Sequence, residues 1–321
     1  MIHVLFTGGT ISMQYDAAAG GNVPTHGGEA LLALAPEVAA MAELRVENWA
    51  RLPACHLTQE DLWRLRERVR ALVADPTVDG IVITHGTDIL EETAYLLDRT
   101  LEPRVPVVVT GAMRTSDHAE WDGARNLTDA VRVAAHGDAA GRGALVVFAG
   151  RVWQGREAVK RDTVALDAFT APYGAPLGAV GPGGVEWSRR LPRGEPLAPT
   201  SLASRVALVP MVVGDDGAVL DAQRKAHDGV VIEAFGSGNL PPRVVPAIGR
   251  WLAAGKPVVL ASRCPEGVVT PVYGFDGGGA RTVAMGVTPA GPRTPSQARW
   301  ELTLALSAGA SYGAGLPAAD A

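Results

Sequence analysis

Short apolar runs that end at Gly, Ser or Thr alternate with longer segments of helical periodicity along the first half of the chain. We expect strands at Ile2–Phe6, Gly80–Thr84, Val105–Thr110 and Gly143–Phe148. We expect amphipathic helices at Glu60–Ala74, Glu91–Leu101 and Ala124–Ala135. This alternation is typical of a mainly parallel sheet covered by helices. The fold class is therefore predicted to be α/β.

The chain has 321 residues, which favours two domains. A Pro- and Gly-rich polar segment from about Gly181 to Pro199 is typical of a linker. Beyond it the alternation resumes, with strands at Arg205–Pro210, Asp228–Ala234 and Pro257–Ser262 and helices at Pro242–Ala254 and Pro295–Leu306. We therefore predict a larger N-terminal α/β domain (1–183), a linker (184–203) and a smaller C-terminal α/β domain (204–321).

Composition excludes several kinds of partner. The net charge is −5 and no Lys/Arg run forms a basic stripe, so nucleic acid is not expected to bind. No apolar run has the length of a membrane helix, so no membrane partner is expected. The two cysteines, Cys55 and Cys264, form no C-x-x-C pattern and fit a reducing compartment, so we expect a cytoplasmic protein. His56 and His85 are isolated, so neither a metal nor another cofactor is expected.

The first candidate site is the loop that follows the first strand and reads Thr7-Gly8-Gly9-Thr10. Loops at the carboxyl ends of parallel strands form the ligand crevice of such sheets, and two glycines allow a sharp turn there. The simpler interpretation is a strand exit or a dinucleotide-binding turn, although G-x-G-x-x-G is absent. Both interpretations stay open, with Thr10 as the candidate reactive hydroxyl.

The second candidate site is the turn His85-Gly86-Thr87-Asp88, after the strand Gly80–Thr84. Asp88 and Glu91 have the spacing of a capping box, which by itself explains a carboxylate here. The same turn offers a hydroxyl, a carboxylate and helix N–H groups that suit an amino acid's charged ends. Lys160 is a surface lysine unless it reaches Thr87, in which case a desolvated amine serves as its base.

Five segments occur in a characteristic order: TGGTI, ITHGTDILEETAYLLD, PVVVTGAMR, DGARNL and GREAVKRDT. Together they resemble the bacterial-type L-asparaginase/glutaminase family, and the likeness extends over nearly the whole chain. The resemblance implies a larger and a smaller α/β domain, an amino-acid substrate and a homo-oligomer built as a dimer of intimate dimers.

The resemblance assigns a role to each matching residue. It implies that Thr10 attacks the side-chain amide of asparagine, that Thr87 and Lys160 handle protons, and that Asp88 holds the α-amino group. Tyr15 corresponds to a tyrosine that orients the nucleophile. The substrate contacts it implies are Gly9, Ala54, Cys55, Gly86, Thr87, Asp88 and Asn239.

Some positions depart from the family pattern. Many relatives have a serine for the α-carboxylate where Ala54 or Cys55 stands here. Asn239 resembles a residue that reaches a neighbouring subunit's site, whereas the glutamate that accompanies it has no clear counterpart; Tyr273 or Asp276 takes its place, or the segment is a simple turn.

The sequence therefore predicts an L-asparaginase, with side activity on glutamine left open. Two alternatives remain. One is an amino-acid sensor on the same fold. The other is the ammonia-supplying subunit of a tRNA-dependent amidotransferase, which the acidic charge disfavours.

Overall fold

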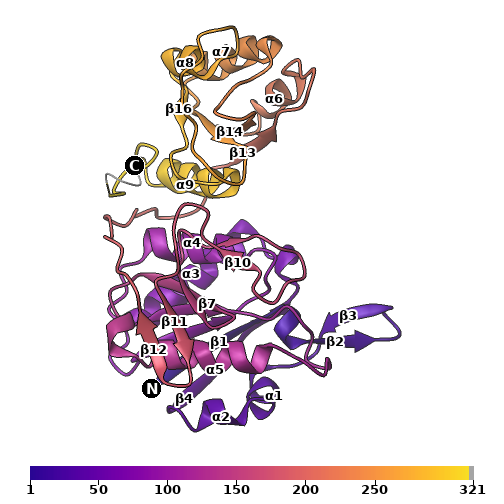
Figure 1. Ribbon diagram of the computed structural model, residues 1–321, viewed down its shortest axis with the longest axis vertical. Helices are drawn as coiled ribbons and strands as arrows, with labels where there is room; N and C mark the ends of the chain where they lie inside the picture. The colour runs from indigo at the N-terminus through magenta and orange to yellow at the C-terminus, as the bar shows by residue number, and fades with distance from the viewer. Residues whose placement is uncertain (318–321) are drawn as a thin grey trace. The chain divides into compact units, whose positions relative to one another are not determined.

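The computed structural model describes residues 1–317 and divides the chain into two compact units, Met1–Pro196 and Leu197 onward (Figure 1). The strands of the first unit are β1 (Ile2–Gly8), β2 (Met13–Asp16), β3 (Gly21–Pro24), β4 (Leu44–Leu52), β5 (Gly80–Thr84), β6 (Val107–Thr110), β7 (Ala144–Phe148), β8 (Arg151–Gln154), β9 (Val159–Lys160), β10 (Phe169–Thr170), β11 (Gly178–Gly181) and β12 (Gly184–Trp187). Its helices are α1 (Gly28–Ala33), α2 (Pro36–Ala39), α3 (Gln59–Ala74), α4 (Leu90–Thr100) and α5 (Gly123–Ala134), with 3-10 turns η1 (Thr10–Ser12), η2 (Ala54–His56) and η3 (Gly137–Ala139).

The main sheet of the N-terminal unit has eight strands in the order β12-β11-β8-β7-β6-β5-β1-β4. The five neighbouring strands β4, β1, β5, β6 and β7 pair in parallel, as expected from the sequence. β8, β11 and β12 continue the sheet in antiparallel pairs. The β2–β3 pair forms a separate antiparallel hairpin, which projects from the unit in Figure 1.

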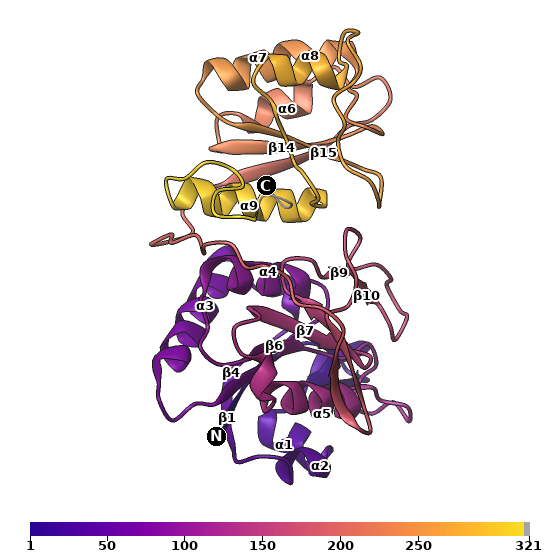
Figure 2. The same ribbon diagram turned by 60° about the vertical axis from the view of Figure 1, so that its left-hand side comes forward.

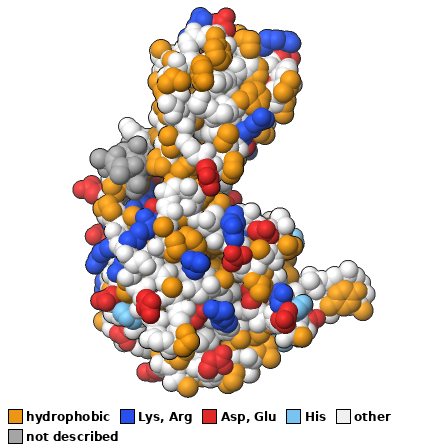
Figure 3. Space-filling view, in the orientation of Figure 1, with side chains coloured by type: hydrophobic (Ala, Val, Ile, Leu, Met, Phe, Trp, Pro, Cys, Tyr) orange, Lys and Arg blue, Asp and Glu red, His pale blue; other side chains and the backbone are white. Residues whose placement is uncertain are grey.

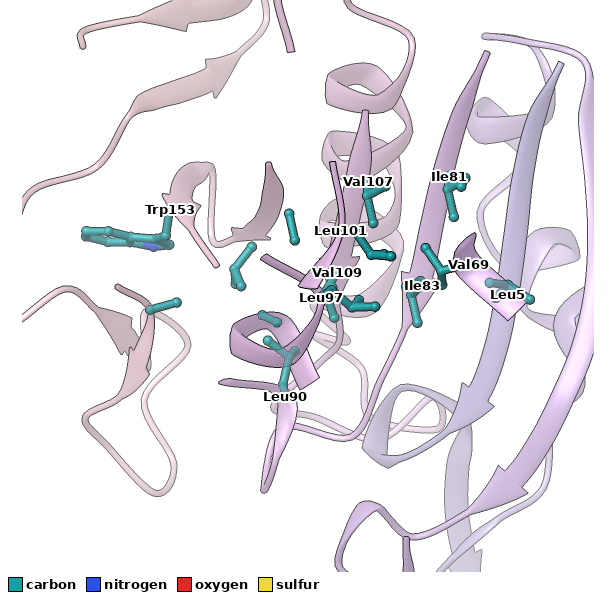
Figure 4. Close-up of a cluster of buried hydrophobic side chains, with 14 of the residues drawn as sticks. Leu5, Val69, Ile81, Ile83, Leu90, Leu97, Leu101, Val107, Val109 and Trp153 are labelled. Carbon is teal, nitrogen blue, oxygen red and sulfur yellow. The ribbon is translucent and has the colours of Figure 1, made fainter. Parts of the chain in front are cut away.

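Each face of this sheet is covered by helices. On β1, Leu5 belongs to one buried cluster, whereas Val4 and Phe6 belong to another, because successive side chains of a strand point to opposite faces. The first face packs against α3 and α4 (Figure 4), and the second against α1, α2 and α5 (Figure 2). The parallel strands are thus buried on both sides, which explains their almost unbroken apolar sequence.

The C-terminal unit repeats this plan with fewer elements. Its elements are β13 (Val206–Pro210), α6 (Ala218–Gln223), β14 (Gly229–Ala234), η4 (Pro242–Val244), α7 (Val245–Ala253), β15 (Val258–Ser262), α8 (Gly279–Ala284), β16 (Thr288–Pro289) and α9 (Pro295–Ser307). The four strands form a parallel sheet in chain order. One face packs against α6 and α7, and the other against α9.

Two local expectations are wrong. Gly184–Trp187, expected to open the linker, form β12, because Gly184 (φ 114°) permits the tight turn that pairs it with β11. The capping box expected at Asp88 and Glu91 does not form, since α4 begins without a side-chain cap. Within residues 1–317, no helix is both long and apolar enough to cross a membrane.

Candidate active site

The carboxyl ends of β1, β5 and β6 lie level with one another. Phe6 is paired with Thr84, and Thr84 with Thr110. The Thr7 hydroxyl donates to the Thr84 carbonyl at 2.9 Å, and the His85 N–H donates to the Thr110 carbonyl at 2.7 Å. The loops that begin with these residues therefore emerge side by side at one edge of the sheet, where parallel α/β sheets bind ligands.

Glycines let these loops approach one another backbone to backbone. Gly9 has φ 81°, and a Cβ atom placed on it would lie 2.3 Å from the Cα of Gly86. A Cβ atom on Gly86 would lie 2.6 Å from that of Ala54. No larger residue fits at Gly9 or Gly86 without displacing a neighbouring loop. Thr10, the first residue of η1, directly follows Gly9, just as Thr87 directly follows Gly86, so the two threonines leave this contact from neighbouring loops.

The side chains of Thr87, Lys160 and Asp88 meet at this edge. Lys160 lies on β9, and its Nζ donates to Thr87 Oγ1 at 2.9 Å. The same Nζ lies 3.5 Å from Asp88 Oδ1. Thr87 is only 4% exposed, and the side chains of Lys160 and Asp88 are 18% and 62% exposed. The hydroxyl–amine pair is thus largely withdrawn from water, whereas the carboxylate remains open to a ligand.

Glu91, in the first turn of α4, is also part of this arrangement. Its Oε2 accepts a hydrogen bond from the backbone N–H of Lys160. Burial raises the pKa of Glu91 to about 7 and Glu92 acts in the same direction, whereas the Lys160 N–H and the Lys160 charge act against this rise. The sequence pattern indicates only a capping role for Glu91, since nothing local points to a contact 69 residues away.

His85 has a structural environment. It is completely buried, its Nδ1 lies 2.9 Å from the Gly86 carbonyl, and its Nε2 lies 3.0 Å from Thr93 Oγ1. Burial lowers the pKa of His85 to about 4, although the contact with Gly86 acts the other way. A neutral, buried His85 therefore links the turn to α4 through its contacts with Gly86 and Thr93.

Gly111, which directly follows β6, was missed by sequence analysis. A Cβ atom there would lie 2.4 Å from the His85 carbonyl oxygen and 3.4 Å from Thr87 Cγ2. The available signal was a glycine immediately after a buried strand, as in the other two loops. Gly111 allows the third loop to support the turn that carries Thr87.

Tyr15 differs from the residues of this cluster because it is largely exposed to solvent. It belongs to β2 and is 62% exposed. Its backbone N–H donates to Asp117 Oδ2 at 3.0 Å. The hairpin stands out from the surface of the N-terminal unit in Figure 3. Within residues 1–317, no hydrogen bond joins the Tyr15 hydroxyl to Thr10.

The remaining candidates divide between the two units. Ala54 is buried at the start of η2, and Cys55 is exposed beside it with a free thiol. In the C-terminal unit, Asn239 Oδ1 accepts from the Gly279 N–H at 3.4 Å, and Asp276 pairs with Arg281 of α8. The Tyr273 ring is stacked on Phe275 with centroids 5.6 Å apart. Among residues 1–317, no cluster of His, Cys, Asp and Glu could hold a metal ion.

Comparison with known proteins relates this arrangement to one family. The family model for the asparaginase N-terminal domain matches residues 1–193, and that for the glutaminase/asparaginase C-terminal domain matches residues 205–314. A probable L-asparaginase of Deinococcus radiodurans is 41% identical over 265 residues, which cover 81% of this chain and 80% of the relative. L-asparaginase 2 of Escherichia coli is 33% identical over 315 residues, covering 95% and 88%.

A solved structure gives the same result for the fold. A probable cytoplasmic L-asparaginase from Campylobacter jejuni superimposes with a TM-score of 0.84 at 29% identity, covering 95% of this chain and 94% of that one. Both family models fall on the two units described above, and together they span most of the chain. The chain therefore belongs to the bacterial L-asparaginase family.

Proposed function

We propose that this protein is an L-asparaginase, which hydrolyses the side-chain amide of L-asparagine to L-aspartate and ammonia. The observation that carries the proposal is the 2.9 Å hydrogen bond between Lys160 Nζ and Thr87 Oγ1, at the sheet edge where the Thr10 loop also emerges. An amine on a largely buried hydroxyl is the arrangement needed to move a proton at an otherwise unreactive alcohol. The family membership supplies the substrate class.

Thr10 is proposed as the nucleophile. Its Oγ1 bonds to the amide carbon and gives up its proton toward Thr87 and Lys160. The C–N bond then breaks, and the nitrogen takes up a proton and leaves as ammonia. Water cleaves the resulting Thr10 ester to aspartate and restores the hydroxyl. Direct attack by water, with Thr10 only polarising the amide, gives the same products; mass spectrometry of a quenched reaction distinguishes the two through an acyl adduct on Thr10.

Substrate is proposed to bind through its charged ends. Asp88 is the exposed carboxylate beside the relay, so it suits the α-ammonium group. The N–H groups of Ala54, Cys55 and Gly86 are proposed to replace the missing serine at the α-carboxylate. Gly9, whose own N–H donates to the Leu52 carbonyl at 3.1 Å, is proposed to contact the substrate through its backbone without that donor. Backbone N–H groups near Thr87 are proposed to stabilise the oxyanion. Tyr15 is proposed to orient Thr10 once the hairpin moves over the substrate.

The experiment is an ammonia-release assay on L-Asn, L-Gln and D-Asn with the wild type and Thr10→Ala. We expect turnover of L-Asn by the wild type and a loss of about 10³-fold or more in the variant, since removing a nucleophile typically costs several orders of magnitude. Thr200→Ala, at an exposed threonine, is the matched control and should behave as wild type. Thr10→Ala turnover above about one percent contradicts the assignment. Calorimetric binding of Asn without any ammonia from the wild type indicates a sensor instead.

We also propose a cytoplasmic homo-oligomer, a dimer of intimate dimers in which Asn239 completes a neighbouring subunit's site. The neighbour named as cytoplasmic and the two free cysteines support the location. Light scattering after size exclusion tests the assembly. Asn239→Ala should raise KM while the assembly stays intact, and an unchanged KM removes Asn239 from the site.

A further inference from the structure

The strand that carries Lys160 lies outside the main sheet. Within residues 1–317, β9 (Val159–Lys160) pairs with β10 alone, through Phe169 with Lys160 and Thr170 with Val159. Ala158 and Phe169 anchor this ribbon in the core of the N-terminal unit. An isolated two-stranded ribbon is marginally stable in water. The residues that connect the two strands are mostly exposed. The Arg161 N–H donates to the Ala168 carbonyl at 2.7 Å within the ribbon, whereas the Lys160 N–H has a partner outside it.

The Glu91 carboxylate makes that attachment. It accepts the backbone N–H of Lys160, whereas the amine of the same residue donates to Thr87. β10 lies near α4 in both ribbon views (Figures 1 and 2), and Figure 2 shows β9 beside β10. Thr87 precedes α4 and Glu91 lies in its first turn, so one rigid segment holds Lys160 at two points.

We infer that Glu91 is a positioning residue for the proposed reaction, which holds the backbone of Lys160 so that its amine reaches Thr87 and which, through its own charge, makes turnover depend on pH. This inference rests on the proposed role of Lys160. Within residues 1–317, no hydrogen bond or ion pair joins Glu91 to Thr10, and its carboxylate is bound to the Lys160 N–H, so its proposed action is through Lys160.

The charged groups around Glu91 explain why turnover should depend on pH. Lys160 faces it from β9, Glu92 lies next to it on α4, and Asp88 Oδ1 lies 3.5 Å from the Lys160 Nζ. The pKa of Glu91 is raised to about 7, chiefly by burial. Below this pH a neutral carboxyl group still accepts the N–H bond through its carbonyl oxygen. Above it, a second negative charge stands beside Lys160 in addition to Asp88, so the charge around the proposed relay changes as the pH passes through this value.

The test compares Glu91→Gln and Glu91→Ala, with Glu92→Gln as a matched control on the same turn. Glutamine keeps an oxygen for the N–H bond but cannot ionise, whereas alanine removes both. We expect kcat of Glu91→Ala to fall about 100-fold with KM changed little, because a small displacement of a reacting group costs about this much. Glu91→Gln should keep most of the activity and lose the inflection near pH 7 in its kcat profile. Glu92→Gln should keep an inflection, moved to a slightly lower pH because the Glu92 charge no longer raises the pKa of Glu91.

The outcomes separate this inference from the proposed function. A wild type that releases no ammonia from any amide refutes the proposed function itself. An active wild type with an inactive Thr10→Ala but a fully active Glu91→Ala refutes only the positioning role. If Glu91→Ala does not fold, the Glu91→Gln profile decides: an inflection near pH 7 that persists there overturns the inference.

Discussion

The strand-end loops and the β2–β3 hairpin both carry proposed catalytic side chains, and they are built in opposite ways. In the loops, Thr87 is 4% exposed and glycine backbones touch one another. In the hairpin, Tyr15 is 62% exposed, and only a few hydrogen bonds, such as that from its N–H to Asp117, tie it to the body. Proton transfer needs fixed geometry, whereas substrate entry needs a part that moves. The difference suggests that the loops are preorganised and the hairpin adapts.

Among these variants, replacing Lys160 by methionine should cause the largest loss of activity. Methionine keeps the length and apolar stem of the side chain but removes the donor to Thr87. We expect kcat for asparagine to fall about 10³-fold, the usual size of an acid–base contribution. The measurement is ammonia release at saturating substrate. Lys225→Met, at an exposed lysine of the C-terminal unit, is the control, and equal losses in both variants would contradict the relay.

Alanine at two glycines of positive φ compares the regions directly. At Gly9 (φ 81°) the new Cβ would meet the Gly86 backbone at 2.3 Å, whereas at Gly20 (φ 68°), in the hairpin turn, nothing lies within 4 Å. We expect Gly9→Ala to destabilise the protein by about 3–4 kcal/mol through strain and overpacking. Gly20→Ala carries only the backbone term, about 1 kcal/mol. Urea unfolding measures both.

The kcat values of the two glycine variants should differ in the same way as their unfolding free energies. Gly9→Ala shifts the Thr10 loop relative to Thr87 and should lower kcat strongly, while Gly20→Ala should leave kcat nearly unchanged. Equal unfolding energies for the two variants would show that the loops are no more tightly packed than the hairpin.

Sequence patterns predicted the parallel part of the fold because each long element carries its own periodicity. β5 was predicted with its observed bounds, Gly80–Thr84. Shorter strands, such as the two-residue β9 and the β11–β12 pair, have too few residues to show a period. The antiparallel extension of the sheet was therefore not predicted.

The site was predictable only in part. The glycines that follow β1 and β5 marked the loops, and the order of motifs indicated the family. The contact of Lys160 with Thr87 joins residues 73 apart, and no local pattern encodes such a distance. At Glu91 a local pattern was present but misleading. Its spacing from Asp88 predicted a capping box, whereas in the fold its carboxylate accepts the backbone N–H of Lys160. The catalytic roles themselves stay predictions until variants are measured.

His85 should make the preorganised region sensitive to acid. Its pKa is about 4 in the folded protein, against an ordinary value of 6.5. Between these values the unfolded chain binds a proton that the folded chain does not, so stability falls as the pH falls from 6.5 toward 4. The loss should approach about 3 kcal/mol. Urea unfolding across this range should show a shallower pH slope for His85→Gln.

The exposed His118, in the loop that contacts the hairpin, provides the matched comparison. His118→Gln should leave the slope as it is in the wild type. A slope unchanged in His85→Gln would mean that His85 takes up its proton in the folded state too.

Tyr15→Phe should have the smallest effect and the most specific one. The hydroxyl lies on an exposed hairpin, so its removal should change the unfolding free energy by less than about 0.5 kcal/mol. If the hairpin moves over bound substrate and the hydroxyl then bonds to Thr10, kcat should fall about tenfold, the value of one hydrogen bond. Activity would thus be lost without stability, the reverse of what buried sites show. An unchanged kcat would mean that the hairpin only covers the substrate and that the Tyr15 hydroxyl takes no part in the reaction. A large loss of stability would mean that the Tyr15 side chain is packed in solution. The loops and the hairpin would then differ less than their exposure indicates.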